Sequence, residues 1–252
     1  MMIFTLAGRE LRSLFISPLA WSILAVVQLI LAYMFLTQLD LFMNLQARLL
    51  GMAGAPGVTE IIVAPILGNA AVVLLLVVPL LTMRLVSEER RSQTLSLLFS
   101  APLSMTEIVL GKFLGVMGFL LVTVLMIVLM PLSLLLGGGL DLGMLAAGVL
   151  GLVLLLAAFA AVGLFMSTLT VQPTIAAVSS FGVLLLLWII DWAGSNDSGQ
   201  ASELFAYLSL LRHFESLLKG VFDSADLLYY LLFVTLFLVL SIRRLDAERL
   251  QH

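Results

Sequence analysis

The stretch MRLVSEERRSQTLSLLFSAPLSMTEIVLGKF, residues 83–113, is a cluster of charge between two long apolar runs. Its charged residues are Arg84, Glu88, Glu89, Arg90, Arg91, Glu107 and Lys112. The flanking apolar runs are each long enough to cross the hydrocarbon core of a bilayer, which takes about 20 residues. The stretch therefore predicts a charged loop between two membrane-spanning helices, and the fold class is all-α integral membrane protein.

The composition of the whole chain supports the same class. Of 252 residues, 62% are hydrophobic and 11% are charged, and the mean hydropathy is +1.22. Soluble domains carry about 25% charged residues. The net charge of −3 argues against a nucleic-acid partner. With no cysteine, only two histidines and no P-loop motif, we predict no catalytic residue, no metal site and no cofactor in this chain.

Six segments are apolar enough to span a membrane. They are residues 18–38, 63–86, 108–136, 142–169, 174–192 and 227–242. None has an ionisable residue near its centre, whereas ion-coupled carriers keep such residues at mid-membrane depth. The first run is long and lacks an Ala-x-Ala exit, so we expect it to remain as a span. Residues 1–252 are predicted to form a single transmembrane domain.

The positions of lysine and arginine predict that both termini are cytoplasmic. The inner set is then Arg9, Arg12, Arg84, Arg90, Arg91, Lys112, Arg243, Arg244 and Arg249, and the outer set is Arg48, Arg212 and Lys219.

Residues 1–17 are predicted to form an interfacial helix. Its apolar arc contains Ile3, Phe4, Ala7, Leu11, Leu14 and Phe15, and its opposite side contains Thr5, Arg9, Arg12 and Ser13, with Leu6 and Glu10 at the boundary. Arg9 and Arg12 would face anionic lipid headgroups. Ser17-Pro18 would then turn the chain into the membrane. The alternative is a simple continuation of the first span.

A second segment outside the spans, about residues 203–220, is predicted to be an outer re-entrant or interfacial helix, because it is too short to span. One face would carry Leu204, Tyr207, Leu208, Leu211, Phe214 and Leu218, and the other Ser209, Arg212, His213 and Ser216.

The charged loop has two parts. Residues 93–101 can form a short cytosolic helix with Leu95, Leu98 and Phe99 at helical spacing, and Ala101-Pro102 ends it. Ser104 and Glu107 then predict a capping box at the start of the next span. Gly111 and Gly115 are spaced for close helix contact, although ordinary packing would also explain them. A short helix presented to the cytosol is a surface that another protein can bind. The alternative is a loop that only sets topology.

On these residues, SEERRSQTLSLLFSAPLSMTEIVLGKF resembles the signature of the ABC-2 type transporter permeases. The stretches LFMSTLTVQPTIAAVSSFGVLLLLWIIDW and LRHFESLLKGVFDSADLLYYLLFVTLFLVLSIRRL are similar to the subgroup associated with gliding motility and nitrous-oxide-reductase maturation. Two positions depart from the family pattern. Gln93 stands where the family often has Gly, and Ser96 stands where it often has an acid.

The resemblance implies a homodimeric permease in the bacterial cytoplasmic membrane that docks two copies of a separate cytosolic ATPase, which would hold ATP and Mg. The implied ATPase contact, around a coupling helix, contains Glu88, Glu89, Arg90, Arg91, Gln93, Thr94, Leu95, Leu98 and Phe99. An extracytoplasmic accessory subunit is also implied, with Tyr207, His213, Phe214 and Glu215 as its expected contact.

Two other classes of function stay open from the residues alone. One is a membrane scaffold or assembly factor that transports nothing, which the absence of a bound ATPase would favour. The other is a secondary transporter or channel, which would need a buried ionisable residue or a polar lining. The sequence names no transported substrate.

Overall fold

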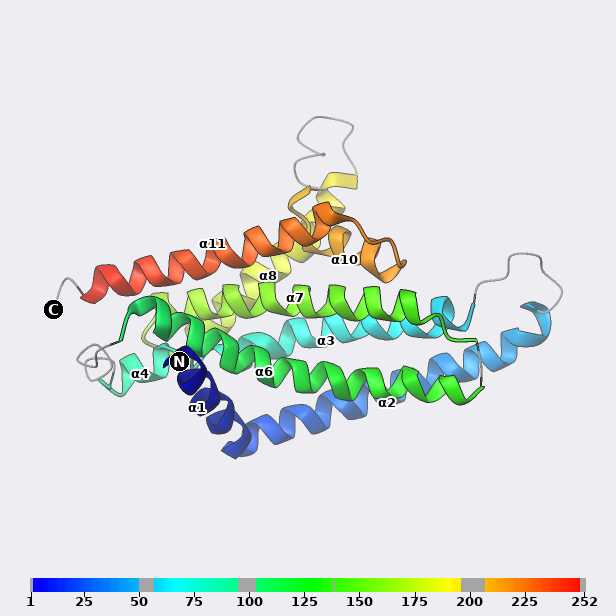
Figure 1. The fold of residues 1–252 in the computed structure, drawn as a ribbon, viewed down its shortest axis with the longest axis horizontal. Helices are drawn as coiled ribbons and strands as arrows, with labels where there is room; N and C mark the ends of the chain where they lie inside the picture. The colour runs from blue at the N-terminus through cyan, green and yellow to red at the C-terminus, as the bar shows by residue number, and fades with distance from the viewer. Residues whose placement is uncertain (1, 50–56, 95–102, 138, 196–206, 250–252) are drawn as a thin grey trace.

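A computed structural model describes residues 2–49, 57–94, 103–137, 139–195 and 207–249, and over these ranges the chain is helical with no strand (Figure 1). The elements are α1 (Met2–Ile16), α2 (Pro18–Leu49), the π-helix η1 (Thr59–Val63), α3 (Ala64–Thr82), α4 (Ser87–Arg91), α6 (Met105–Leu132), the 3-10 helix η2 (Ser133–Gly137), α7 (Leu142–Leu169), α8 (Pro173–Ser195), α10 (Leu210–Leu218) and α11 (Ser224–Arg249). In the described residues, 6 helical segments are long and apolar enough to cross a membrane. The predicted fold class is confirmed.

Helix α7 lies at the centre of the bundle. It contacts α3, α6, α8, α10 and α11, and the share of its apolar window that is buried, 61%, exceeds that of every other candidate span. Small residues on α7, among them Ala158, Ala160 and Ala161, are completely buried. Small side chains let neighbouring helices approach closely where no hydrophobic effect drives association. Large apolar side chains such as Leu29, Leu125 and Leu232 remain exposed and form the lipid-facing surface.

Several helices have limits that differ from those of the predicted spans. Helix α2 runs to Leu49 instead of residue 38, and Asn44 Nδ2 donates to Asp40 Oδ2 at 3.3 Å in this extension. The added 11 residues lengthen the helix by about 16 Å at 1.5 Å per residue. Helix α11 covers 224–249 instead of 227–242. The second span ends at Thr82, and only the fourth, 142–169, has the predicted limits.

Both chain ends lie at the same end of the bundle, together with α4 (Figure 1). We call this the proximal end. At the other end, the distal end, η1 lies beside the start of α7, where the backbone N–H of Asp141 donates to Thr59 Oγ1 at 2.8 Å. Six spans place both termini on the same side of the membrane, and that this side is the cytoplasm stays a prediction.

Helix α1 packs closely across α6 on a row of glycines. A Cβ added at Gly111 would lie 2.7 Å from Leu6 Cβ, and one added at Gly115 would lie 2.6 Å from Glu10 Cβ. Real Cβ atoms essentially never approach so closely. The Gly111/Gly115 spacing therefore serves close helix contact, and its partner is the N-terminal helix.

A side chain at Gly115 should push α1 away from α6. We expect Gly115→Val to lower the free energy of unfolding by about 1–3 kcal/mol, the usual cost of overpacking. Chemical unfolding in detergent, followed by tryptophan fluorescence, measures this loss. Gly8→Val is the matched control, because nothing lies within 4 Å of a Cβ at Gly8. An equal effect of the two variants would contradict the close packing.

Candidate functional site

The turn between α3 and α4 is held by a side chain from the central helix. Ser167 Oγ accepts hydrogen bonds from the backbone N–H groups of Val86 (3.0 Å) and Ser87 (3.1 Å) and donates to the carbonyl of Met83 at 3.1 Å. Ser167 is completely buried. These bonds satisfy backbone groups that the interruption of the helix leaves free. Helix α4 is thereby fixed against α7 at the proximal end.

Lys112 is the centre of a buried cluster of charge. Its Nζ donates to Glu89 Oε1 of α4 at 2.7 Å and to Glu10 Oε1 of α1 at 3.1 Å. Lys112 is only 1% exposed, although it lies on the membrane-spanning helix α6. A buried ammonium is tolerated only when charged partners and hydrogen bonds compensate for its lost hydration. The cluster therefore joins three separate helices through one cation.

A second ion pair extends the cluster to the C-terminal helix. Arg90 Nη2 of α4 donates to Glu248 Oε2 of α11, and both side chains are largely buried. We call Glu10, Glu89, Arg90, Lys112 and Glu248 the ion-pair junction. Within the described residues, Glu89 Oε2 and Arg90 Nε are buried without a hydrogen-bond partner. The short helix α4 is thus connected to α1, α6 and α11 by charge, and to α7 by Ser167.

The structure divides the residues predicted for the ATPase contact into two groups. Glu88, Arg91, Gln93 and Thr94 are exposed, and among the described residues the carboxylate of Glu88 forms a long ion pair with Arg84 Nε at 3.9 Å. Glu89 and Arg90, which were also predicted to contact the ATPase, instead form ion pairs within the ion-pair junction. Leu95, Leu98 and Phe99, and with them most of the segment 93–101, lie outside the described residues.

Gln93 has a backbone conformation that explains the glycine often found at this position in the permeases that the loop resembles. Its φ is +57°, in the left-handed region that favours glycine. The N–H of Thr94 donates to the carbonyl of Glu89 at 3.0 Å, which is the closing bond of a helix C-terminal motif. The chain therefore turns sharply out of α4 at Gln93, the first residue of the segment 93–101 that was predicted as the coupling helix, so this helix does not begin at Gln93.

The capping box predicted at Ser104 and Glu107 is present. The N–H of Glu107 donates to Ser104 Oγ at 3.2 Å, and the N–H of Ser104 donates to Glu107 Oε2 at 3.0 Å. This cap starts α6 afresh after the loop, so that Lys112 lies two turns into the helix.

The predicted face of the N-terminal helix needs a correction. Leu6 and Glu10, placed at the boundary of the helical wheel, form the inward face against α6, and Leu6 is the buried residue of α1. Phe4, predicted within the apolar arc, is 76% exposed. Arg9 and Arg12 are exposed, as an interfacial helix requires. Leu11, Leu14 and Phe15 of the predicted apolar arc pack against the core, so the buried face is that arc extended to Leu6 and Glu10.

The outer segment contains a second polar cluster, which connects α10 to α11 near the distal end. His213 Nδ1 lies 2.6 Å from Asp226 Oδ1, and His213 Nε2 lies 2.9 Å from the carbonyl oxygen of Tyr207. Ser216 Oγ donates to Asp226 Oδ2. The His213 ring also stacks on Tyr229 with centroids 4.0 Å apart. The cluster fixes α10 beside the first turns of α7, where Gly151 contacts Leu217 and Phe214.

In the described part of the chain, the helix predicted over about residues 203–220 is shorter, and its two faces are not divided into buried and exposed as apolar and polar residues are. The helix is α10, Leu210–Leu218, capped by Ser209, and residues 203–206 lie outside the described residues. Among the predicted partner contacts, Tyr207 and Glu215 are exposed, whereas His213 and Phe214 are buried. His213 was assigned to the polar face because the sequence does not show that Asp226 lies opposite it.

In the described parts of the chain, no group of three or more His, Asp or Glu side chains is placed to hold a metal ion. A family model described as "ABC-2 family transporter protein" matches residues 4–250. No curated protein matches the chain.

Proposed function

Because the chain belongs to the ABC-2 transporter family and is a membrane permease subunit, we propose that ATP hydrolysis by a separate cytosolic ATPase drives it through the segment 87–101. In this proposal the ATPase, which supplies ATP and Mg, docks on the exposed residues Glu88, Arg91, Gln93 and Thr94 and on the coupling helix that follows. Two ATPase copies would serve two copies of this chain.

The ion-pair junction is the observation that carries this proposal. Helix α4 has only five residues, yet it is bonded directly to α6, α7 and α11, and through Lys112 it is linked to Glu10 of α1. A push on the segment that follows α4 would therefore reach four helices at once. Transitions of this kind move rigid elements against each other, and buried ion pairs keep the moving parts in register. The absence of ionisable residues near the predicted span centres agrees with a driving force supplied from outside the bilayer.

The proposed orientation places the proximal end in the cytoplasm of a bacterial cell, with both termini inside. Its support is the density of cations at that end, where Arg9, Arg12, Arg91, Arg243 and Arg244 are all exposed. On the outer side, an accessory subunit would meet the exposed residues Tyr207 and Glu215 of the segment 203–220. Similarity of residues 164–192 and 211–245 to the gliding-motility and nitrous-oxide-reductase-maturation subgroup favours such an attached partner.

Reversal of the exposed charges should release the ATPase. We expect Glu88→Arg/Arg91→Glu to weaken co-purification with the ATPase encoded nearest to this gene by at least about tenfold, because opposite charges that meet at an interface then repel. Pull-down from detergent with a titration of ATPase measures the loss. Arg244→Glu, an exposed charge at the same end, is the control and should retain binding.

Two outcomes would contradict the proposal. If the double variant binds as tightly as the wild type, the ATPase docks on another surface. If neither protein retains an ATPase, the charged stretch only sets topology, and a non-transporting scaffold or a secondary transporter becomes the better interpretation.

A further inference from the structure

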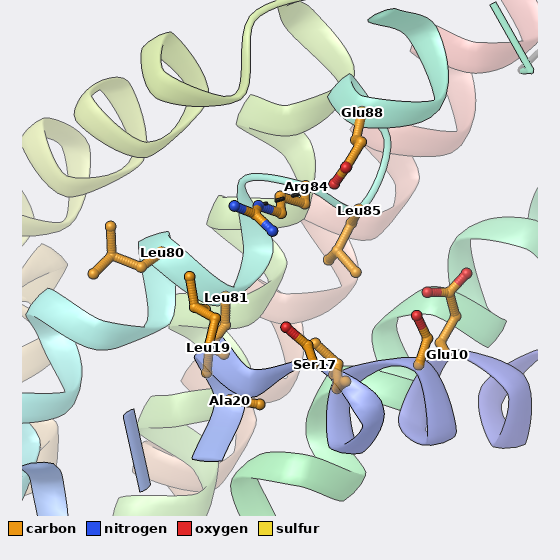
Figure 2. A pocket seen from close by; sticks show the side chains of 11 residues that line it. Glu10, Ser17, Leu19, Ala20, Leu80, Leu81, Arg84, Leu85 and Glu88 are labelled. Carbon is orange, nitrogen blue, oxygen red and sulfur yellow. Dashed lines mark ion pairs between the residues drawn. The ribbon is translucent and has the colours of Figure 1, made fainter. Parts of the chain in front are cut away.

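A cavity of about 240 Å³ lies at the proximal end, between α1, the start of α2, the end of α3 and α4 (Figure 2). Its walls divide by chemistry. Arg84, Glu88, Ser13 and Ser17 line the polar part, and leucines from α1, α2 and α3 with Ala20 line the apolar part. Figure 2 shows Arg84 and Glu88 on one side of the hollow and Ser17 on the other.

Two neighbouring features indicate that the cavity lies at the depth of the lipid headgroups. Its floor is the Ser17-Pro18 break, where the chain turns from the interfacial helix α1 into the span α2. Trp21, one turn further, is 58% exposed, and its indole N–H donates to the carbonyl of Phe15 at 2.7 Å. Exposed tryptophans with one polar contact are typical of the membrane–water interface. The molecules that meet this cavity at highest concentration are therefore phospholipids.

The charges of the cavity match a headgroup that carries both signs. Arg84 Nε and Glu88 Oε2 are 3.9 Å apart, and their side chains are 49% and 58% exposed, so their mutual pair is weak. Arginine and hydroxyl groups bind phosphate, and a free carboxylate binds an ammonium. A purely anionic headgroup would offer no cation to Glu88, whereas Glu10, the other carboxylate of the lining, already pairs with Lys112 and Arg9.

The apolar side of the cavity continues as a lipid-facing row. Leu80, which lines the cavity, is 44% exposed, and Leu76 and Val72, four and eight residues earlier on α3, are 53% and 49% exposed. Residues at this spacing share one face of a helix. An acyl chain attached to a headgroup in the cavity would lie along this row.

We propose that the cavity binds a zwitterionic phospholipid whose headgroup carries a primary ammonium. The phosphate lies between Arg84 and the hydroxyls of Ser13 and Ser17, the ammonium donates to Glu88, and an acyl chain follows Leu80, Leu76 and Val72. The bound lipid then connects the α1–α2 corner to α4. The cavity shares Glu88 with the proposed ATPase contact, but lipid retention is measured on the purified chain without an ATPase, so the test does not depend on the proposed function.

Native mass spectrometry of the detergent-purified chain tests the proposal. Phosphatidylethanolamine, phosphatidylcholine and phosphatidylglycerol with identical acyl chains are added at equal concentration. We expect phosphatidylethanolamine to be retained about tenfold more than the other two, the value of one charge-assisted hydrogen bond. Arg84→Gln should remove this preference. Ser13→Trp should do the same by filling the cavity from its exposed rim without changing any charge, and Arg244→Gln should leave it intact.

Three results would overturn the inference. The first is equal retention of all three lipids by the wild type, which indicates an annular shell without selectivity. The second is an unchanged preference in both Arg84→Gln and Ser13→Trp when their unfolding midpoints equal that of the wild type. The third is displacement of the lipid by an equal concentration of glycerophosphoethanolamine, which would assign the cavity to a soluble phosphate ester instead of a membrane lipid.

Discussion

Lys112→Met is expected to destabilise the protein by about 3–5 kcal/mol, the usual cost of removing one partner from a buried ion pair. The methionine side chain has a similar length, so the main change is electrostatic. Glu10 and Glu89 would lose their shared cation, and Glu89 Oε2 already lacks a partner within the described residues. Unfolding of the purified chain by SDS titration in mixed micelles measures the change in free energy.

Neutralising the acids in the same background gives the decisive control. The triple variant Lys112→Met/Glu10→Gln/Glu89→Gln removes the stranded charges, and we expect it to regain most of the lost stability, because a neutral replacement of a whole buried cluster is often nearly neutral in free energy. Glu88→Gln, which alters the exposed pair with Arg84, should change stability by less than about 1 kcal/mol. A small effect of Lys112→Met, or no recovery in the triple variant, would contradict a buried junction.

Hydropathy predicted the existence and the number of the spans, because burial in hydrocarbon demands long apolar runs whatever the rest of the chain does. It did not predict where the helices end. The end of α2 beyond residue 38 mixes apolar residues with Asp40, Asn44 and Arg48, so the hydropathy does not mark a sharp end of the helix there. The break after Thr82 depends on Ser167, which is 84 residues from the carbonyl of Met83 that it binds.

The junction shows which part of the site a sequence can reveal. Lys112 was noted only as a charge at the start of a span, and its partners lie 23 and 102 residues away. One signal was available. A lysine inside an apolar helix needs a carboxylate, and Glu10 is the single acid among residues 1–17. The need of Lys112 for a carboxylate, together with the close-contact spacing of Gly111 and Gly115, predicts that the N-terminal helix packs against α6.

The outer cluster illustrates the opposite case, in which a regular pattern misled. A helical wheel of residues 203–220 separates apolar from polar side chains well, and it assigns His213 to the polar, exposed face. In the structure His213 is 7% exposed, because Asp226 and Tyr229 of α11 lie against it. A wheel describes one helix alone, and it fails where a polar group is satisfied by another helix.

Asp226→Leu is accordingly expected to detach α10 from α11. Asp226 is 7% exposed and accepts hydrogen bonds from both His213 and Ser216. Its loss leaves the buried His213 Nδ1 without this partner, whereas Ser216 Oγ keeps its hydrogen bond to the carbonyl of His213. The expected cost is about 1–3 kcal/mol, the cost of one unsatisfied buried polar group. Amide hydrogen exchange of residues 210–218 should accelerate strongly, whereas exchange in α7 should change little because its own hydrogen bonds remain.

Asp223→Asn provides the comparison within the same turn. Asp223 is exposed and accepts only from the backbone N–H of Ala225, at 2.9 Å, among the bonds of the described residues. Asparagine caps a helix nearly as well, so this variant should exchange like the wild type. If Asp226→Leu also leaves the exchange of α10 unchanged, then α10 is held by its apolar face alone, through Phe214 and Leu217 against α7, and the polar cluster contributes nothing to the position of the outer segment.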